Sequence, residues 1–148
     1  MSRVQLALNV ADVDEAVAFY SKLFGVGPAK RRPGYANFAI AEPLLKLVLL
    51  QTGAPGGTLN HLGVEVSSTQ EVGAATQRLA ASGLGTDVEE NVDCCYALQD
   101  KVWVQDPDGA RWEVYTVLAD TANVCAEPSI CCAATAESAS PGQNGCCG

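Results

Sequence analysis

The sequence is poor in positive charge and in histidine. Its 148 residues include 9 lysines and arginines against 17 acidic residues, which gives a net charge of −8, and there is a single histidine. No lysine or arginine follows Arg111. A chain without a basic patch is a poor partner for nucleic acid or for anionic membranes, so the charge balance argues against both classes of function.

Long hydrophobic runs are also lacking. The apolar segment Leu44–Leu50 is short and is interrupted by Lys46, whereas a membrane-spanning helix needs roughly 20 apolar residues. No secretory signal pattern follows Met1. The composition, with 48% hydrophobic residues, is that of a globular protein, and we expect a cytoplasmic protein with no membrane partner. The sequence leaves a homodimer open.

The sequence contains an internal repeat. Gln5–Val10 and His61–Val66 both alternate an apolar residue with a small or polar one, as a strand with one packed face does. Each segment is followed by a helix-start signal, at Asp12 and at Ser68, with a glutamate three residues later. The helices are expected to end at Gly25 and Gly83. Each repeat therefore begins with a strand and a helix.

Further strand patterns extend each repeat to a β-α-β-β-β module. Strands are predicted at roughly 35–41, 46–51, 97–98 with its neighbours, 101–105 and 111–117. The cationic cluster Lys30–Arg32, between two prolines, is expected to be a solvated loop. We predict an α+β fold of two βαβββ modules, about 3–51 and 61–118, which form one domain (1–118) around a shared metal-containing cavity. Residues 119–148 are expected to be a flexible cysteine-rich tail.

Three side chains form a candidate metal site. Gln5 and His61 occupy equivalent positions in the repeat, and Glu113 lies on the same inner face in the last predicted strand. The repeat partner of Glu113 is about Lys46. A lone histidine is more often structural, but its coincidence with Gln5 favours a ligand role. Amide, imidazole and carboxylate suit Fe(II), Mn(II), Ni(II), Co(II) or Zn(II), and three protein ligands leave positions open for chemistry.

The adjacent cysteines, Cys94 and Cys95, form the second candidate site. Seven cysteines, an odd number, favour thiols used for binding or chemistry over a disulfide framework. As thiolates, two neighbouring cysteines suit a thiophilic centre such as trivalent arsenic or cadmium. The alternative is that one is a buried core residue and the other is incidental. The pair is expected on a mobile loop that overhangs the cavity.

The motifs Asn60–Gly63, Asp106–Gly109 and Trp112–Tyr115, within paired βαβββ modules, resemble the glyoxalase/bleomycin-resistance/extradiol-dioxygenase superfamily, also called vicinal oxygen chelate proteins. This resemblance covers residues 3–118. The metal set, the cysteine pair and the cysteine-rich C-terminus further resemble the organoarsenical carbon–arsenic lyases, which are often labelled cadmium-inducible proteins.

The second resemblance implies an activity and a role for each site. It implies Fe(II)- and O₂-dependent cleavage of the carbon–arsenic bond of trivalent organoarsenicals such as methylarsenite, as in organoarsenical detoxification. Iron would be bound by Gln5, His61 and Glu113, and arsenic by Cys94 and Cys95. The products would be arsenite and, from a methyl group, formaldehyde.

Several alternatives stay open on the sequence. The chain could be a non-catalytic binder that sequesters drugs, a sink for metalloid or cadmium, or a glyoxalase-type lyase or isomerase. A glyoxalase-type enzyme would need a fourth metal ligand, and Lys46 stands near that position instead. The tail cysteines either capture metalloid or belong to a dispensable extension; they are Cys125, Cys131, Cys132, Cys146 and Cys147.

Overall fold

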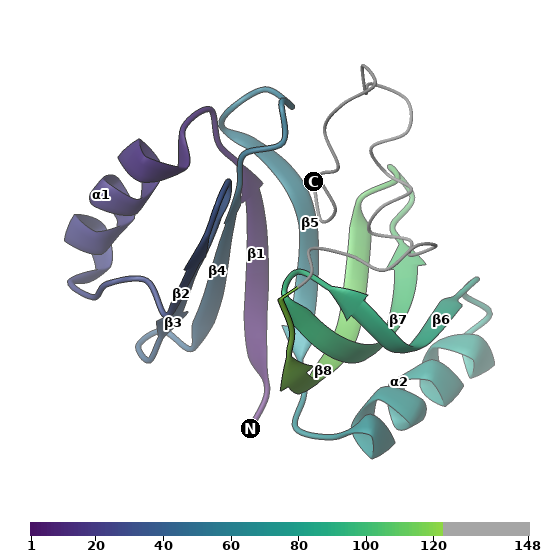
Figure 1. Ribbon diagram of the computed structural model, residues 1–148. Coiled ribbons are helices and arrows are strands. Elements are labelled where there is room, and N and C mark those ends of the chain that lie inside the picture. The colour runs from purple at the N-terminus through teal and green to yellow at the C-terminus, as the bar shows by residue number, and fades with distance from the viewer. Residues whose placement is uncertain (123–148) are drawn as a thin grey trace.

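The computed structural model describes residues 1–122 and contains the two predicted modules (Figure 1). The first module consists of β1 (Arg3–Asn9), α1 (Val13–Phe24), β2 (Lys30–Arg32), β3 (Tyr35–Ile40) and β4 (Leu45–Leu50). The second consists of β5 (Thr58–Glu65), α2 (Thr69–Ala81), β6 (Asp87–Cys94), β7 (Ala97–Gln105) and β8 (Arg111–Asp120). The expected α+β fold of two βαβββ modules is confirmed. In the second module, however, the segments predicted at 97–98 and 101–105 belong to the single strand β7, and the strand β6 precedes both of them.

All eight strands form one sheet in the order β2-β3-β4-β1-β5-β8-β7-β6. β1 and β5 pair antiparallel at its centre, while β1–β4 and β5–β8 pair parallel, so the modules are related by an approximate twofold axis between β1 and β5. The sheet curls, and each helix covers the outer side of its own half (Figure 1). The inner side of the curl is left for a shared cavity.

The helices form where the capping signals predict. Asp12 and Ser68 are the N-caps, and their side chains accept hydrogen bonds from the backbone N–H groups of Glu15 and Glu71. α1 ends at Gly25, whose φ of 69° is a left-handed conformation that glycine adopts without strain. In the first module, side chains of α1 pack with the outward apolar residues of the strands in one hydrophobic cluster. The polar positions of β1 and β5 therefore face the inner side.

Two expectations about loops are wrong. Lys30–Arg32 is not a loop but the edge strand β2, which pairs antiparallel with β3. Arg31 and Arg32 are exposed there, so no burial pattern in the sequence revealed the strand. Cys94 and Cys95 are likewise not on a long loop. Cys94 ends β6, and Cys95 and Tyr96 form a tight turn into β7 with φ values of 56° and 61°.

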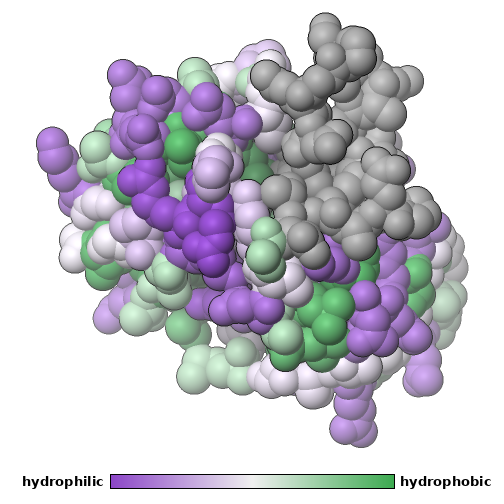
Figure 2. Space-filling model, viewed as in Figure 1, coloured by the Kyte–Doolittle hydropathy of each residue, from purple (hydrophilic) through white to green (hydrophobic). Residues whose placement is uncertain are grey.

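The described residues contain no helix that is both long enough and apolar enough to cross a membrane. On the face shown in Figure 2, the hydrophobic residues of the described part form small patches separated by hydrophilic ones.

Candidate functional site

The three proposed metal ligands meet in the middle of the sheet. Gln5 lies on β1, His61 on β5 and Glu113 on β8, and these three strands are neighbours. His61 Nε2 lies 3.2 Å from Gln5 Nε2 and 3.3 Å from Glu113 Oε1, and the amide nitrogen of Gln5 lies 2.8 Å from the same carboxylate oxygen. All three side chains are at most 4% exposed. The structure thus brings the predicted set together.

The 3.3 Å between His61 Nε2 and Glu113 Oε1 fits two neighbouring ligands of one divalent cation, and the amide of Gln5 lies beside both atoms. Neighbouring ligands of an octahedral ion lie about 3 Å apart when the metal–ligand bonds are about 2.1 Å long. Residues 1–122 contain no cluster of three His, Cys, Asp or Glu side chains that could hold a metal by themselves. A site at this place therefore depends on the amide of Gln5 as the third ligand.

His61 is oriented by its sequence neighbour. Its Nδ1 lies 2.6 Å from the side-chain oxygen of Asn60, which places the Nδ1 proton toward Asn60 and leaves Nε2 as the acceptor facing Gln5 and Glu113. The ring also meets the Trp103 ring at 5.5 Å in an edge-to-face arrangement. Asn60 was part of a motif in the sequence, but its role as the partner of His61 became visible only in the structure.

Glu113 has a cationic partner that the sequence did not single out. Lys101 on β7 is 1% exposed, and its Nζ lies 2.9 Å from Glu113 Oε2. Burial by itself raises the pKa of Glu113, but the Lys101 ammonium outweighs it and holds that pKa well below its usual range. Glu113 is therefore ionised and available to a cation through its other oxygen. The available signal was Lys101 on the inner face of a mostly buried strand.

The register of the sheet corrects the repeat partner of Glu113. Ala7 and Gly63 are equivalent under the twofold; Ala7 pairs with Val48 and Gly63 with Glu113. The partner of Glu113 is therefore Val48, not Lys46, because the strand pairing sets the equivalence two residues further along β4. Valine has no metal-ligating atom, so the fourth position of a pseudo-symmetric site holds no ligand.

Lys46 belongs to a polar network beside Gln5, His61 and Glu113, which are called the triad from here on. Its Nζ lies 3.3 Å from Glu65 Oε2, and Arg3 also binds the Glu65 carboxylate. Burial lowers the pKa of Lys46, and although burial tends to raise that of Glu65, the two cations lower it overall. Tyr115 contacts both Glu65 and Gln5, and burial raises its pKa well above the ordinary value, so its hydroxyl keeps the proton.

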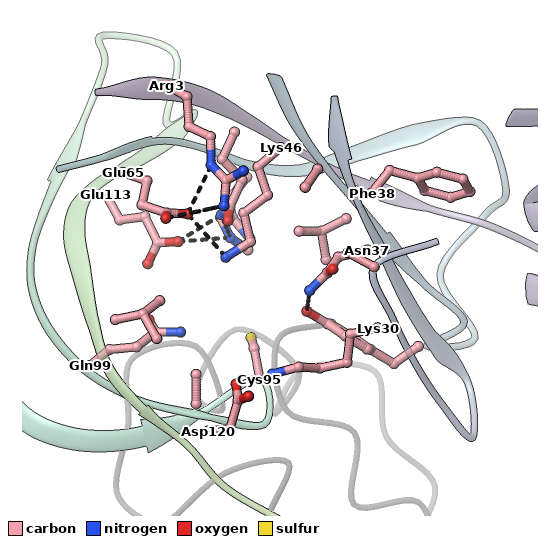
Figure 3. Close-up of a pocket in the computed structure, with 18 residues that line it drawn as sticks. Arg3, Lys30, Asn37, Phe38, Lys46, Glu65, Cys95, Gln99, Glu113 and Asp120 are labelled. Carbon is pink, nitrogen blue, oxygen red and sulfur yellow. Dashed lines mark hydrogen bonds and ion pairs between the residues drawn. The ribbon is translucent and has the colours of Figure 1, made fainter. Parts of the chain in front are cut away.

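A cavity of about 200 Å³ opens on this site (Figure 3). Its lining includes Gln5, His61 and Glu113 together with Cys95. Cys94 is fully buried in a hydrophobic cluster with Trp103 and other residues, and its sulfur lies 3.3 Å from that of Cys95. The two cysteines therefore differ: the side chain of Cys95 lines the cavity, and that of Cys94 lies behind it. The tail cysteines fall outside the described residues.

Gly63 leaves the space in which the triad assembles. A methyl group built there would lie 3.1 Å from Glu113 Cγ and 3.3 Å from Gln5 Nε2. We expect Gly63→Ala to displace both side chains and weaken Mn²⁺ binding by about tenfold, because overpacking a buried site costs about 1–3 kcal/mol. Titration followed by the electron paramagnetic resonance of free Mn²⁺ measures this. Gly73→Ala on α2, where an added methyl contacts nothing, is the control, and equal affinities in the two variants would contradict the prediction.

Comparison with known proteins agrees with the fold. A family model described as the Glyoxalase/Bleomycin resistance protein/Dioxygenase superfamily matches residues 3–114. The chain belongs to this superfamily. Solved structures similar to this superfamily member include an extradiol ring-cleaving dioxygenase from B. fuscum, with TM-score 0.60 and 20% identity over 80% of this chain and 33% of that one. Another is the Mn(II)-bound glyoxalase from Novosphingobium aromaticivorans, with TM-score 0.57 and 20% identity over 88% and 44%.

Superfamily members with higher identity carry names related to arsenic and cadmium. The "Cadmium-induced protein CadI" of Mycobacterium tuberculosis is 64% identical over 121 residues, which are 82% of this chain and 80% of that protein. The "Trivalent organoarsenical cleaving enzyme" of Thermomonospora curvata is 58% identical over 134 residues, 89% of each chain. A protein of the same name from Bacillus sp. is 40% identical. The resemblance seen in the motifs is thus confirmed at the level of the family.

Proposed function

We propose that the protein cleaves the carbon–arsenic bond of trivalent organoarsenicals, with ferrous iron as cofactor and O₂ as co-substrate. The observation that carries the proposal is that Gln5, His61, Glu113 and the side chain of Cys95 line one and the same cavity. The amide, imidazole and carboxylate groups suit a divalent metal cofactor, and the sulfur of Cys95 in the same cavity suits a thiophilic substrate. Relatives at 58% and 40% identity that are named for organoarsenical cleavage support this substrate class.

The triad is the proposed iron site. When bound, ferrous iron supplies the capacity to bind and activate O₂. Gln5, His61 and Glu113 hold it and leave other positions open, while Asn60 fixes the orientation of the His61 ring and Lys101 that of the Glu113 carboxylate. Nickel, cobalt, manganese or zinc would fit the same ligands, since the set is not selective by chemistry alone.

The cysteine pair is the proposed arsenic site. In the reduced protein, thiolates of Cys94 and Cys95 would replace hydroxyls on the arsenic and hold the organic substituent inside the cavity. Such positioning accounts for a large part of many enzymatic rate enhancements. For methylarsenite the overall reaction balances as CH₃As(OH)₂ + O₂ → As(OH)₃ + HCHO. The carbon–arsenic bond breaks, the methyl carbon is oxidised and O₂ is reduced.

Oxygen uptake with methylarsenite tests the proposal. Reduced protein loaded with Fe²⁺ is expected to consume about one O₂ for each arsenite and each formaldehyde released, as the balanced equation requires. Metal-stripped protein and an anaerobic sample are the controls and should release neither product. Binding of methylarsenite without product release in the iron-loaded, aerated sample would exclude the lyase.

Binding of methylarsenite without product release would favour a second candidate function, in which the protein sequesters cadmium or metalloid through its thiols. The specific observation in its favour is the high identity to relatives named for cadmium induction. It gives no role to the buried triad. A glyoxalase-type isomerase is disfavoured because Val48 stands where a fourth ligand would be expected.

A further inference from the structure

The hydroxyl of Tyr115 has two acceptors and one proton. Tyr115 on β8 is fully buried, and its oxygen lies 2.6 Å from Gln5 Oε1 and 2.9 Å from Glu65 Oε2. Since a tyrosine hydroxyl donates one hydrogen bond, it cannot satisfy both oxygens at once. The structure therefore places one more acceptor around Tyr115 than its proton can serve.

The other end of the Gln5 amide faces the triad. Its NH₂ group lies 2.8 Å from Glu113 Oε1 and 3.2 Å from His61 Nε2, so its two protons serve the two atoms that would bind a metal. His61 Nε2 is the acceptor nitrogen because Nδ1 faces Asn60. In this arrangement the amide nitrogen of Gln5 lies on the side from which a cation would be bound.

We propose that Gln5 is a two-state ligand whose amide rotates by half a turn when a cation binds, with Tyr115 as the positioning residue that stabilises the rotated state. This inference rests on the metal assignment of the proposed function. After rotation, Oε1 faces the cation between His61 and Glu113, and the NH₂ group donates to the Tyr115 oxygen. The tyrosine hydroxyl then donates to Glu65 alone, so its one proton no longer faces two acceptors.

A cation is required for the rotated state. Without one, rotation would bring the amide oxygen of Gln5 against the Glu113 carboxylate oxygen, at the 2.8 Å now spanned by a hydrogen bond. Two buried acceptors at that distance repel each other. Arg3 and Lys46 hold Glu65 in place at the far end, so the acceptor for Tyr115 is fixed in both states. Figure 3 shows Arg3, Lys46 and Glu65 gathered on one side of the cavity.

The direct test is nuclear magnetic resonance of the full chain with ¹⁵N-labelled glutamine. The Gln5 resonances are assigned from those missing in Gln5→His. In the metal-stripped protein the Gln5 amide protons are expected to show nuclear Overhauser effects to the His61 ring. On saturation with diamagnetic Zn²⁺ these effects should move to the Tyr115 ring. Effects that stay at His61 in the Zn²⁺-saturated protein would overturn the proposal.

The matched variant is Tyr115→Phe, with Tyr35→Phe as control. Tyr35 lines the same cavity, is 4% exposed, and has Asn37 as its hydroxyl partner among the described residues. The metal-bound state loses one more hydrogen bond than the metal-free state in Tyr115→Phe, so the Kd for Mn²⁺ should rise about tenfold, with Tyr35→Phe unchanged. Mn²⁺ is chosen because thiolates bind it poorly.

An unchanged Kd in Tyr115→Phe, or an equal rise in both variants, would overturn the inference. These outcomes are distinguishable from failure of the proposed function. Metal binding with the expected amide rotation but without arsenite release would exclude the lyase and keep the two-state ligand. Absence of Mn²⁺ and Zn²⁺ binding at the triad would overturn both.

Discussion

Replacement of Cys95 by Ser is expected to abolish arsenite release from methylarsenite while Fe²⁺ stays bound. The side chain of Cys95 lines the cavity and none of the triad contacts depends on it, so serine removes the soft ligand without disturbing the metal site. A hydroxyl has nearly the size of a thiol but lacks the affinity of sulfur for trivalent arsenic. Arsenite release and iron content, measured in parallel on reduced protein, check the prediction.

Cys94→Ser should abolish the same activity with a further cost in stability. Cys94 is fully buried among Ala7, Tyr35, Val48 and Trp103, where burying a hydroxyl in place of the less polar thiol costs about 1–3 kcal/mol. Thermal unfolding therefore separates the two cysteines, since Cys95→Ser should unfold near the wild-type temperature. Cys125→Ser is the control, because the proposed arsenic site does not include Cys125. Wild-type turnover in both Cys94→Ser and Cys95→Ser would refute the arsenic site.

Loss of a triad ligand is the second large effect. His61→Ala and Glu113→Gln are each expected to lose bound iron and about a hundred- to a thousandfold in turnover, the order of magnitude that removal of an essential catalytic group costs. Elemental analysis and the turnover assay measure the two losses. Glu90→Gln on the exposed side of β6 makes the same substitution away from the cavity and should retain both. Stoichiometric iron at the site in His61→Ala would refute the assignment.

The choice of glutamine at position 113 follows from Lys101. Glu113→Ala leaves the Lys101 ammonium buried without its carboxylate, and breaking such a pair costs about 3–5 kcal/mol. Glu113→Ala is therefore expected to unfold at a clearly lower temperature than Glu113→Gln, whose amide oxygen still accepts from Lys101. Circular dichroism melts of the two variants compare them. Equal melting temperatures would show that the ion pair contributes little to stability.

The sequence determined the architecture because each module carries its own local signals. Alternation in Gln5–Val10 and His61–Val66 fixes which face of each strand is apolar, and the caps at Asp12 and Ser68 fix where the helices begin. The repeat also places Gln5 and His61 at equivalent positions of the two modules. These features depend on neighbours in the chain, so they can be read from one sequence.

The tertiary structure decided what depends on pairing between distant segments. The strands β2 and β6 are edge strands with few buried side chains, so their hydrogen bonds to β3 and β7 define them, and a hydrophobic pattern does not. The register of β4 against β1 makes Val48, and not Lys46, the residue equivalent to Glu113 in the first module.

The residues of the candidate site also fall into two groups, those that the sequence predicted and those that only the folded sheet brought together. The repeat predicted that Gln5, His61 and Glu113 share the inner face of related strands, and the structure brings these three side chains together. The sequence could not separate Cys94 from Cys95, since the difference arises from the tight turn that turns one sulfur into the core and the other toward the cavity. Nor could it pair Lys101 with Glu113 or Tyr115 with Gln5, because hydrogen bonds between strands depend on register, which only the folded sheet sets.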